Sequence, residues 1–316
     1  MLGKTAGGLF WMSRYLERSE NSARLLDAGF RIALTRSQSA ADEWGSVLTT
    51  VGARDAYAQK YDDFTSKQVI DFLLRDAGNP GSVLSITKLA RDNARLVRTA
   101  LTREVWEATN ECWMTLQDLL RRQVREQDLP DVLNVIRKQS ALVRGAVMGT
   151  MMRNDAFNFS RLGTFIERAD NTARILDVKY YLLLPTSANV GSSLDNVQWE
   201  TILRSVSAQR SYRWLNGPDT NPVQVAEYLI LNQQMPRALA FCYNKIDDNL
   251  GHLEGNYGGR TGASQMADDI CEEYMDQPIE TIFENGLHEF LLDFLSANNR
   301  LAAQIERDYR FQPSGG

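Results

Sequence analysis

Hydrophobic residues return every three or four positions along most of this 316-residue chain, which is the spacing of a helix with one buried face. Few runs of β-branched residues alternate with period two, and no Asn-Gly or Asp-Gly turn separates such runs. The pattern therefore predicts an all-α fold. The expected helices lie near 8–34, 41–58, 66–77, 80–100, 102–126, 130–152, 156–183, 195–212, 222–234, 236–254, 263–276 and 279–310.

Two asparagines stand directly before a proline, Asn79 before Pro80 and Asn221 before Pro222. An asparagine side chain can cap the free N–H groups of a helix start, and proline is favoured at the first helical position. Both pairs are therefore predicted to begin helices. Breaks rich in Pro, Gly, Ser or Asn are expected to be loops, near 35–40, 184–195 and 213–221.

One thirteen-residue segment occurs twice. YLERSENSARLLD begins at Tyr15 and FIERADNTARILD begins at Phe165, and at this offset of 150 seven of the thirteen positions are identical. Further along, VIDFLLRDAGNP aligns with VAEYLILNQQMP at an offset of 156, so that Pro80 corresponds to Pro236. A period of about 150 residues is too long for a solenoid and indicates the tandem duplication of a whole helical unit. The identical positions are Glu17/Glu167, Arg18/Arg168, Asn21/Asn171, Ala23/Ala173, Arg24/Arg174, Leu26/Leu176 and Asp27/Asp177.

No flexible linker separates the two copies, because the helix expected at 130–152 leads directly into the second motif. We therefore expect a single domain, residues 1–316, with internal repeats at about 8–150 and 151–311 related by a pseudo-twofold axis. Residues 312–316 are expected to form a flexible tail.

The duplicated segment gathers its charged and amide side chains on one face of a helix. At about 100° per residue, Glu17, Glu20, Asn21, Arg24 and Asp27 share one side. This face could be solvated, with Glu20 and Arg24 as an i,i+4 pair, or it could form a shared polar site or an ion-pair network. The charged identities that both copies keep favour the second interpretation, and the candidate residues are Glu17, Arg18, Asn21, Arg24, Glu167, Arg168, Asn171 and Arg174.

If the two copies face each other, each glutamate should pair with an arginine of the other copy. Glu17 is then expected near Arg168 or Arg174, and Glu167 near Arg18 or Arg24. The same face is predicted to line a concave pocket, because a paired guanidinium keeps N–H donors that can bind a carboxylate.

A second group of charges lies in the helix expected at 80–100. Arg91, Arg95 and Arg98 follow i, i+4, i+7 spacing and would make a basic stripe. Such a stripe is either an ordinary solvated face or a surface that meets an acidic patch on a partner protein.

Composition excludes several classes of function. The net charge of −5 gives no general attraction to nucleic acid or to an anionic membrane. No apolar run is long enough to span a membrane, and GKTAGGLFWM near the start makes a poor signal peptide. Three widely spaced cysteines, Cys112, Cys242 and Cys271, are typical of reduced thiols in the cytoplasm rather than of a disulfide framework or a zinc site.

Familiar catalytic motifs are missing. The two histidines, His252 and His288, belong to no metal-binding motif, and the chain has no nucleophile elbow. The glycine-rich run GNYGGRTG at 255–262 lacks the lysine and the strand of a phosphate loop, so we expect a flexible connector there. The residues therefore predict neither a metal nor another cofactor.

The doubled Glu-Arg signature, RYLERSENSARLLD and TFIERADNTARILD with NPGSVLSITKLARDNARLVRTALTREVWEATN between them, resembles the bacterial alpha-E family. The resemblance runs from about Gly8 to Phe311, and it places the signature on Glu17-Arg18 and Glu167-Arg168. It implies an all-helical domain with no established activity. It also implies that the gene lies beside, or is fused to, that of a circularly permuted ATP-grasp protein. A transglutaminase-like cysteine peptidase is often encoded nearby, and sometimes a proteasome-like hydrolase.

Two functional hypotheses follow. In the first, the protein is a partner or accessory component of an ATP-grasp amidoligase system, binding the ligase or its substrate. In the second, it is an enzyme in its own right that acts on a carboxylate- or peptide-containing substrate, with glutamates as general acid and base and arginines as carboxylate ligands. The absence of a recognisable nucleotide-binding motif favours the first hypothesis.

Overall fold

The computed structural model describes residues 1–33, 40–183 and 193–311, and within these ranges every regular element is a helix. The predicted all-α class is confirmed. The tail expected at 312–316, and most of the loops expected at 35–40 and 184–195, lie outside the described residues. The helices are α1 (Gly3–Ala33), α2 (Ala40–Thr50), α3 (Arg54–Ala58), α4 (Ser66–Leu74), α5 (Val83–Leu96), the 3-10 turn η1 (Arg98–Ala100), α6 (Arg103–Leu119), the 3-10 turn η2 (Glu126–Asp128), α7 (Leu129–Thr150), α8 (Asp155–Leu183), α9 (Ser193–Ser205), α10 (Gln209–Asn216), α11 (Pro222–Ile230), α12 (Leu239–Tyr257), α13 (Gly262–Tyr274), α14 (Ile279–Asn285) and α15 (Leu287–Asp308).

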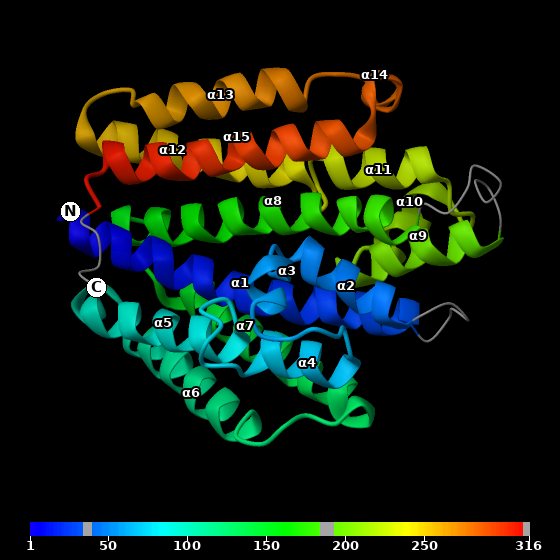
Figure 1. Cartoon of the computed structure of the whole chain (residues 1–316). Coiled ribbons are helices and arrows are strands. Elements are labelled where there is room, and N and C mark those ends of the chain that lie inside the picture. The colour runs from blue at the N-terminus through cyan, green and yellow to red at the C-terminus, as the bar shows by residue number, and fades with distance from the viewer. Residues whose placement is uncertain (34–39, 184–192, 312–316) are drawn as a thin grey trace.

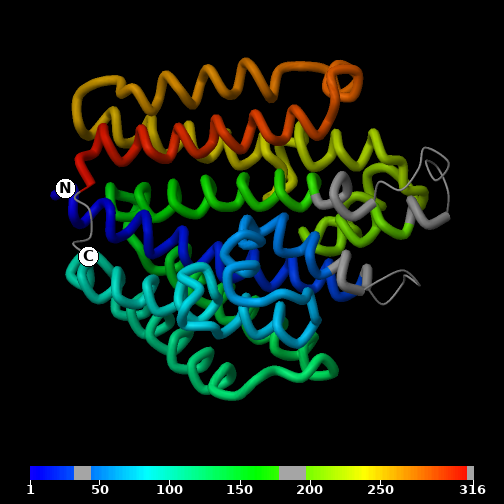
Figure 2. Tube along the Cα trace, in the orientation of Figure 1, coloured from blue at the N-terminus to red at the C-terminus, as the bar shows by residue number. Residues whose placement is uncertain are grey.

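The two long helices α1 and α8 lie side by side at the centre of the molecule and run in the same direction (Figure 1). Helices α5 and α7 pack on α1, while α12 and α15 pack on α8. The start of α1 and the end of α15 meet at one end of the bundle, where Gly3 touches the backbone of Arg310 (Figure 2). One apolar core runs through both halves of the chain. Because similar packing can arise without gene duplication, the tandem duplication stays a prediction.

Three helices that the sequence predicts as continuous are each divided at a residue with positive φ. The helix expected at 41–58 divides at Gly52 (φ 69°), that at 195–212 at Ser207 (φ 59°), and that at 279–310 at Gly286 (φ 100°). A residue in this region of φ cannot continue a right-handed helix, so the chain turns and a new helix begins. The helix expected at 80–100 is also shorter, because α5 ends at Leu96.

Of the two predicted Asn-Pro helix starts, one is confirmed and one is wrong. The side chain of Asn221 accepts hydrogen bonds from the backbone N–H groups of Val223 and Gln224 at the start of α11. By contrast, α5 begins three residues after Pro80 and is capped by Ser82. Asn79 is buried, and its amide donates to the carbonyl oxygen of Phe72 at 3.0 Å, so it stabilises the turn before α5 instead.

The close approach of α1 and α8 depends on a glycine. A Cβ atom at Gly163 would lie 2.2 Å from the carbonyl oxygen of Phe10, well inside the sum of the atomic radii. The two backbones are therefore in direct contact at this position, and the polar side chains further along both helices are brought within hydrogen-bond distance of each other.

Gly163→Ala is expected to lower the free energy of unfolding by about 1–3 kcal/mol, because the added methyl group forces α1 and α8 apart. Urea denaturation measures the change. Gly251→Ala is a matched control, since Gly251 lies within α12 and a Cβ there meets no atom within 4 Å. That control should be neutral or slightly stabilising. Equal behaviour of the two variants would contradict the packing argument.

Candidate functional site

The Glu-Arg pairs of α1 and α8 cross between the two helices. Because the helices are parallel and nearly in register, residues about 150 positions apart lie opposite each other. Arg168 binds Glu17 through two N–H groups, with Nε to Oε1 at 3.0 Å and Nη2 to Oε2 at 3.1 Å. Arg18 binds Glu167 in the same two-pronged manner, at 2.6 and 2.8 Å. The predicted pairing of each glutamate with an arginine of the other copy is confirmed.

Three further arginines complete this network, and the sequence reasoning missed them. Arg14 donates from Nε to Glu167 at 3.0 Å. Arg144, from α7, contacts both Glu17 and Glu20. Arg237, in the turn before α12, lies 3.1 Å from Glu17 and donates to Glu20 at 2.6 Å. The position of Arg14 one turn before Arg18 was a readable signal, whereas Arg144 and Arg237 come from other elements and follow no local pattern.

Burial excludes the interpretation of the polar face as solvated. Glu17 and Glu20 are each 1% exposed, and Asn21 is 5% exposed. Arg24 pairs with Glu20 as expected, but it also donates to the carbonyl oxygen of Ser205 at 2.8 Å and is almost fully covered. The face therefore forms an ion-pair network inside the protein.

The two asparagines of the duplicated motif differ in their contacts. Asn21 donates to the carbonyl oxygen of Glu167 at 3.2 Å and accepts from Arg237 at 3.4 Å. Asn171 is 2% exposed, yet neither its amide nitrogen nor its amide oxygen has a hydrogen-bond partner in the protein. Buried polar atoms are nearly always hydrogen-bonded, so this exception marks Asn171 as a group that a ligand or water can satisfy.

Arg174 is the most exposed of the four candidate residues in the second copy. It binds Asp170 through Nε at 2.7 Å, and its side chain is 31% exposed. It does not contact Glu17, which binds Arg168 instead.

The network holds its carboxylates in the ionised form. Burial alone would raise the pKa of Glu17, but the surrounding guanidinium groups outweigh burial and keep the pKa well below its ordinary range. The pKa values of Glu20 and Glu167 are lowered against burial by the same kind of neighbour, Arg237 first for Glu20 and Arg18 first for Glu167.

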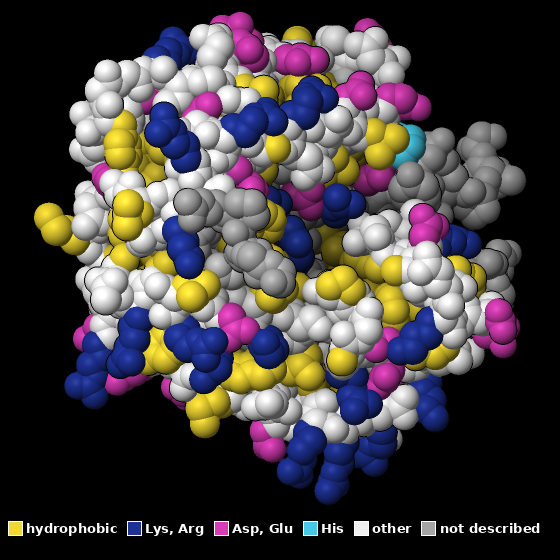
Figure 3. All heavy atoms as spheres, turned by 60° about the vertical axis from the view of Figure 1, so that its left-hand side comes forward, with side chains coloured by type: hydrophobic (Ala, Val, Ile, Leu, Met, Phe, Trp, Pro, Cys, Tyr) yellow, Lys and Arg dark blue, Asp and Glu magenta, His cyan; other side chains and the backbone are white. Residues whose placement is uncertain are grey.

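A cavity of about 440 Å³ opens beside the network, between the α1–α8 pair and the segments that join α2 to α3 and α4 to α5. We call it the network pocket. It confirms the expectation of a concave pocket on this polar face, although Glu17, Arg24 and Arg168 lie behind it rather than in its wall. On the face shown in Figure 3, basic and acidic side chains gather around a hollow near the centre. The polar side chains of its wall are Arg14, Arg18, Asn21, Ser22, Asn79, Glu167, Asp170, Asn171, Arg174 and Asn299.

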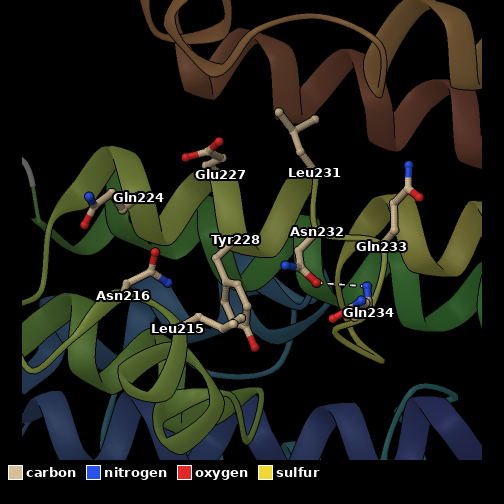
Figure 4. A pocket seen from close by; sticks show the side chains of 9 residues that line it. All are labelled: Leu215, Asn216, Gln224, Glu227, Tyr228, Leu231, Asn232, Gln233 and Gln234. Atoms are coloured by element: carbon tan, nitrogen blue, oxygen red, sulfur yellow. Dashed lines mark hydrogen bonds between the residues drawn. The ribbon is translucent and has the colours of Figure 1, made fainter.

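A second cavity, of about 570 Å³, lies where α10 ends and α11 passes into the following turn (Figure 4). Its polar side chains are mostly amides, and Glu227 is the single charged residue among the described residues that line it. It shares no residue with the network. Its lining residues are Leu215, Asn216, Gln224, Glu227, Tyr228, Leu231, Asn232, Gln233 and Gln234.

The cysteines are unsuited to nucleophilic chemistry. Burial raises the pKa of Cys112 and Cys242 to about 12 and that of Cys271 to about 11, so all three are thiols at neutral pH. Within the described ranges, no group of three His, Cys, Asp or Glu side chains is placed to hold a metal ion. In the same part of the chain, no helix combines the length and the apolar character needed to cross a membrane.

The predicted arginine stripe lies at the surface but is less regular than expected. Arg91 is half-buried and donates to Asn110 on α6 at 2.7 Å. Arg95 is exposed, with its side chain 63% accessible, and Arg98 belongs to η1 rather than to α5 and lies over the ring of Trp106. The prediction of one stripe along a single helix is therefore corrected, because α5 ends before Arg98. The glycine-rich run is similarly divided, since α12 extends to Tyr257 and the connector begins at Gly258.

The fold and the site together define an all-helical protein organised around two buried, crossed Glu-Arg motifs. The family model of Alpha-E, described as a predicted alpha-helical domain with a conserved ER motif, matches residues 1–309, and the chain belongs to this family. Uncharacterized proteins of Mycobacterium bovis and Mycobacterium tuberculosis are 24% identical over 91% of the chain. The chain spans 34% of the length of these relatives. No solved structure matches it.

Proposed function

We propose that the protein binds a carboxylate-bearing substrate in the network pocket and presents it, in the cytoplasm, to a circularly permuted ATP-grasp amide ligase. The observation that carries the proposal is the place of Arg18 in the pocket wall. Its bonds to Glu167 use Nε and Nη2, and its side chain is 36% exposed, so the N–H groups of Nη1 remain for a ligand. Paired guanidinium donors are the usual protein ligands of carboxylates.

The carboxylates of the network support substrate binding better than acid-base catalysis. A general acid must be protonated at the working pH, and an efficient general base has a pKa near that pH. The lowered pKa values of Glu17, Glu20 and Glu167 give neither property. The alternative hypothesis, an enzyme in its own right acting on a carboxylate- or peptide-containing substrate, shares the pocket but requires a proton donor that the network does not supply.

In this proposal the ligase supplies the ATP site and the bond-forming chemistry. A transglutaminase-like peptidase is a second proposed partner, which would cleave amide bonds in the same system. The exposed surface around Arg91, Arg95 and Arg98 is our proposed contact with an acidic patch on the ligase, because exposed charges of one sign steer the approach of a complementary partner.

Co-purification with the ATP-grasp protein that is encoded beside this chain, followed by an ATP-turnover assay with and without the chain, tests the proposal. We expect a complex and a turnover that depends on the chain. Robust ATP turnover or amide-bond chemistry by the purified chain alone would favour the alternative hypothesis.

The double variant Arg95→Glu, Arg98→Glu is expected to slow association with the ligase by about tenfold or more at low ionic strength, and less at high salt. Biolayer interferometry at two salt concentrations measures this, and the circular dichroism spectrum should not change. Arg300→Glu on α15 is the control, because it reverses an exposed charge on the other half of the molecule. A loss of the same size in the control would place the contact elsewhere.

A further inference from the structure

The network pocket occupies a position that an arginine side chain fills in the other half of the molecule. Gly81 lies two residues before the first residue of α5, and Arg237 lies two residues before the first residue of α12. Each directly follows a proline, Pro80 or Pro236. Arg237 is 6% exposed and reaches into the network, whereas Gly81 carries no side chain and lines the open pocket.

The contacts of Arg237 show what is missing beside Gly81. Its guanidinium bridges two neighbouring residues of α1, donating from Nη2 to Glu20 at 2.6 Å and from Nη1 to Asn21 at 3.4 Å. The corresponding neighbours on α8 are Asp170 and Asn171, and both line the pocket. The amide oxygen of Asn171 is buried without a donor, as expected of a site from which one guanidinium is absent.

The charges of the two sites agree with this comparison. Around Arg237, two glutamates are accompanied by four guanidinium groups, and around the pocket two carboxylates are accompanied by three. One further guanidinium would make the two sites alike. The first set is Glu17 and Glu20 with Arg24, Arg144, Arg168 and Arg237, and the second is Glu167 and Asp170 with Arg14, Arg18 and Arg174.

We propose that the network pocket binds a ligand with a guanidinium group, which takes the place of the missing arginine and bridges Asp170 and Asn171. The inference rests on the proposed function in one respect, namely that the ligand also carries the carboxylate that Arg18 binds. Free arginine has both groups, and an arginine side chain of a peptide has the guanidinium alone.

The buried site of Arg237 shows that the network tolerates a further guanidinium group. Burial and the neighbouring Arg24 lower the pKa of Arg237 to about 10, which still leaves its guanidinium charged at neutral pH. The pocket is more open than the site of Arg237, so a ligand guanidinium there keeps contact with water and meets a smaller desolvation penalty.

Isothermal titration calorimetry of the purified chain with L-arginine tests the proposal directly. L-citrulline has nearly the same shape but a neutral ureido group, and it should bind at least about tenfold more weakly, since charge-assisted hydrogen bonds are lost. Nα-acetylarginine amide lacks both the carboxylate and the charged amino group, as an arginine residue within a peptide does, and therefore distinguishes the free amino acid from a peptide side chain. Weaker binding than L-arginine indicates the free amino acid, and equal binding indicates an arginine side chain of a peptide.

Gly81→Arg should abolish binding, because the new side chain can fill the pocket from within and donate to the amide oxygen of Asn171. A Cβ at Gly81 meets only the side-chain oxygen of Asn79, at 3.3 Å, so a small shift of that side chain accommodates the change, and the φ of Gly81 is one that other residues adopt. Gly259→Arg is the matched control, because it adds the same charge at an open position where a Cβ has no neighbour within 4 Å. The control should bind L-arginine as the parent chain does.

Asn171→Ala provides a second test, in which a proposed ligand contact is removed and no side chain is added to the pocket. Asn171 has no partner in the protein, so its loss should leave the melting temperature unchanged and weaken L-arginine binding by about tenfold or more. No binding of L-arginine at millimolar concentration, equal binding of L-citrulline, or retained binding in Gly81→Arg would overturn the inference. Since these measurements use the chain alone, a chain that stimulates the ligase but fails them would leave the proposed function standing.

Discussion

Replacing Glu17 by Gln is expected to lower the free energy of unfolding by about 3–5 kcal/mol. The substitution preserves the size of the side chain and removes its charge. Arg168 then loses the carboxylate that it binds, and Arg144 and Arg237 keep only Glu20. Because Glu17 is 1% exposed, water cannot replace the lost interaction. Urea denaturation at pH 7, followed by circular dichroism, measures the change.

Glu107→Gln is the matched control for Glu17→Gln. Glu107 also binds an arginine, Arg103, at 2.7 Å, but both side chains are more than half exposed. Such a surface pair contributes little, so no measurable change is expected. If both variants were equally stable, the buried network would not stabilise the fold and its role would lie in binding alone.

Acid is expected to destabilise the protein steeply below about pH 4.5, the range in which an unfolded glutamate titrates. The folded pKa values of Glu17, Glu20 and Glu167 are lowered, so the stability that these groups contribute is complete above the unfolded pKa and is lost as the pH falls through the folded values. Each unit of lowering corresponds to about 1.4 kcal/mol. Denaturation midpoints measured from pH 7 to pH 3 give the profile.

Two other carboxyl groups work in the opposite direction. Burial raises the pKa of Asp177 and of Glu306, so each becomes protonated more readily in the folded chain than in the unfolded chain and recovers some stability as the pH falls. We expect the three network glutamates to outweigh them. The Glu17→Gln variant should therefore lose less stability than the parent chain between pH 7 and pH 3. Parallel profiles for the two proteins would exclude Glu17 as a source of the acid sensitivity.

Much of the fold could be read from the spacing of hydrophobic residues, because each amphipathic helix buries one face and repeats it every three to four residues. The breaks between helices were harder to predict. Gly52 and Gly286 were visible as glycines, but a glycine within a helical pattern does not by itself state its φ. Ser207 carried no signal at all, since a serine has no particular preference for positive φ; in the structure its hydroxyl accepts a hydrogen bond from Arg24 at 2.9 Å.

The centre of the site was predictable because its Glu-Arg motif occurs twice in the sequence. A buried charge needs a partner, and the duplicated Glu-Arg motif offered that partner at an offset of 150. Arg144 could not be found in this way, as it reaches the network from α7 through tertiary packing alone. Gly81 and Arg237 directly follow Pro80 and Pro236 in the sequence, but no local pattern indicates that Arg237 reaches Asn21 or that Asn171 is unpaired.

The crossing of the Glu-Arg pairs between α1 and α8 has a consequence for how this chain can change over generations. Glu167 is bound by arginines of α1, and Glu17 is bound by Arg168 of α8 in addition to Arg144 and Arg237, so neither half holds a balanced set of buried charges by itself. A substitution at Glu17 removes a carboxylate partner from Arg144 in the first half and from Arg168 and Arg237 in the second, so its compensation involves positions about 150 residues away or more. The two copies are therefore expected to mutate in concert at these positions while drifting freely elsewhere, and exchanging one half for that of a distant relative should yield a chain whose buried ions no longer match.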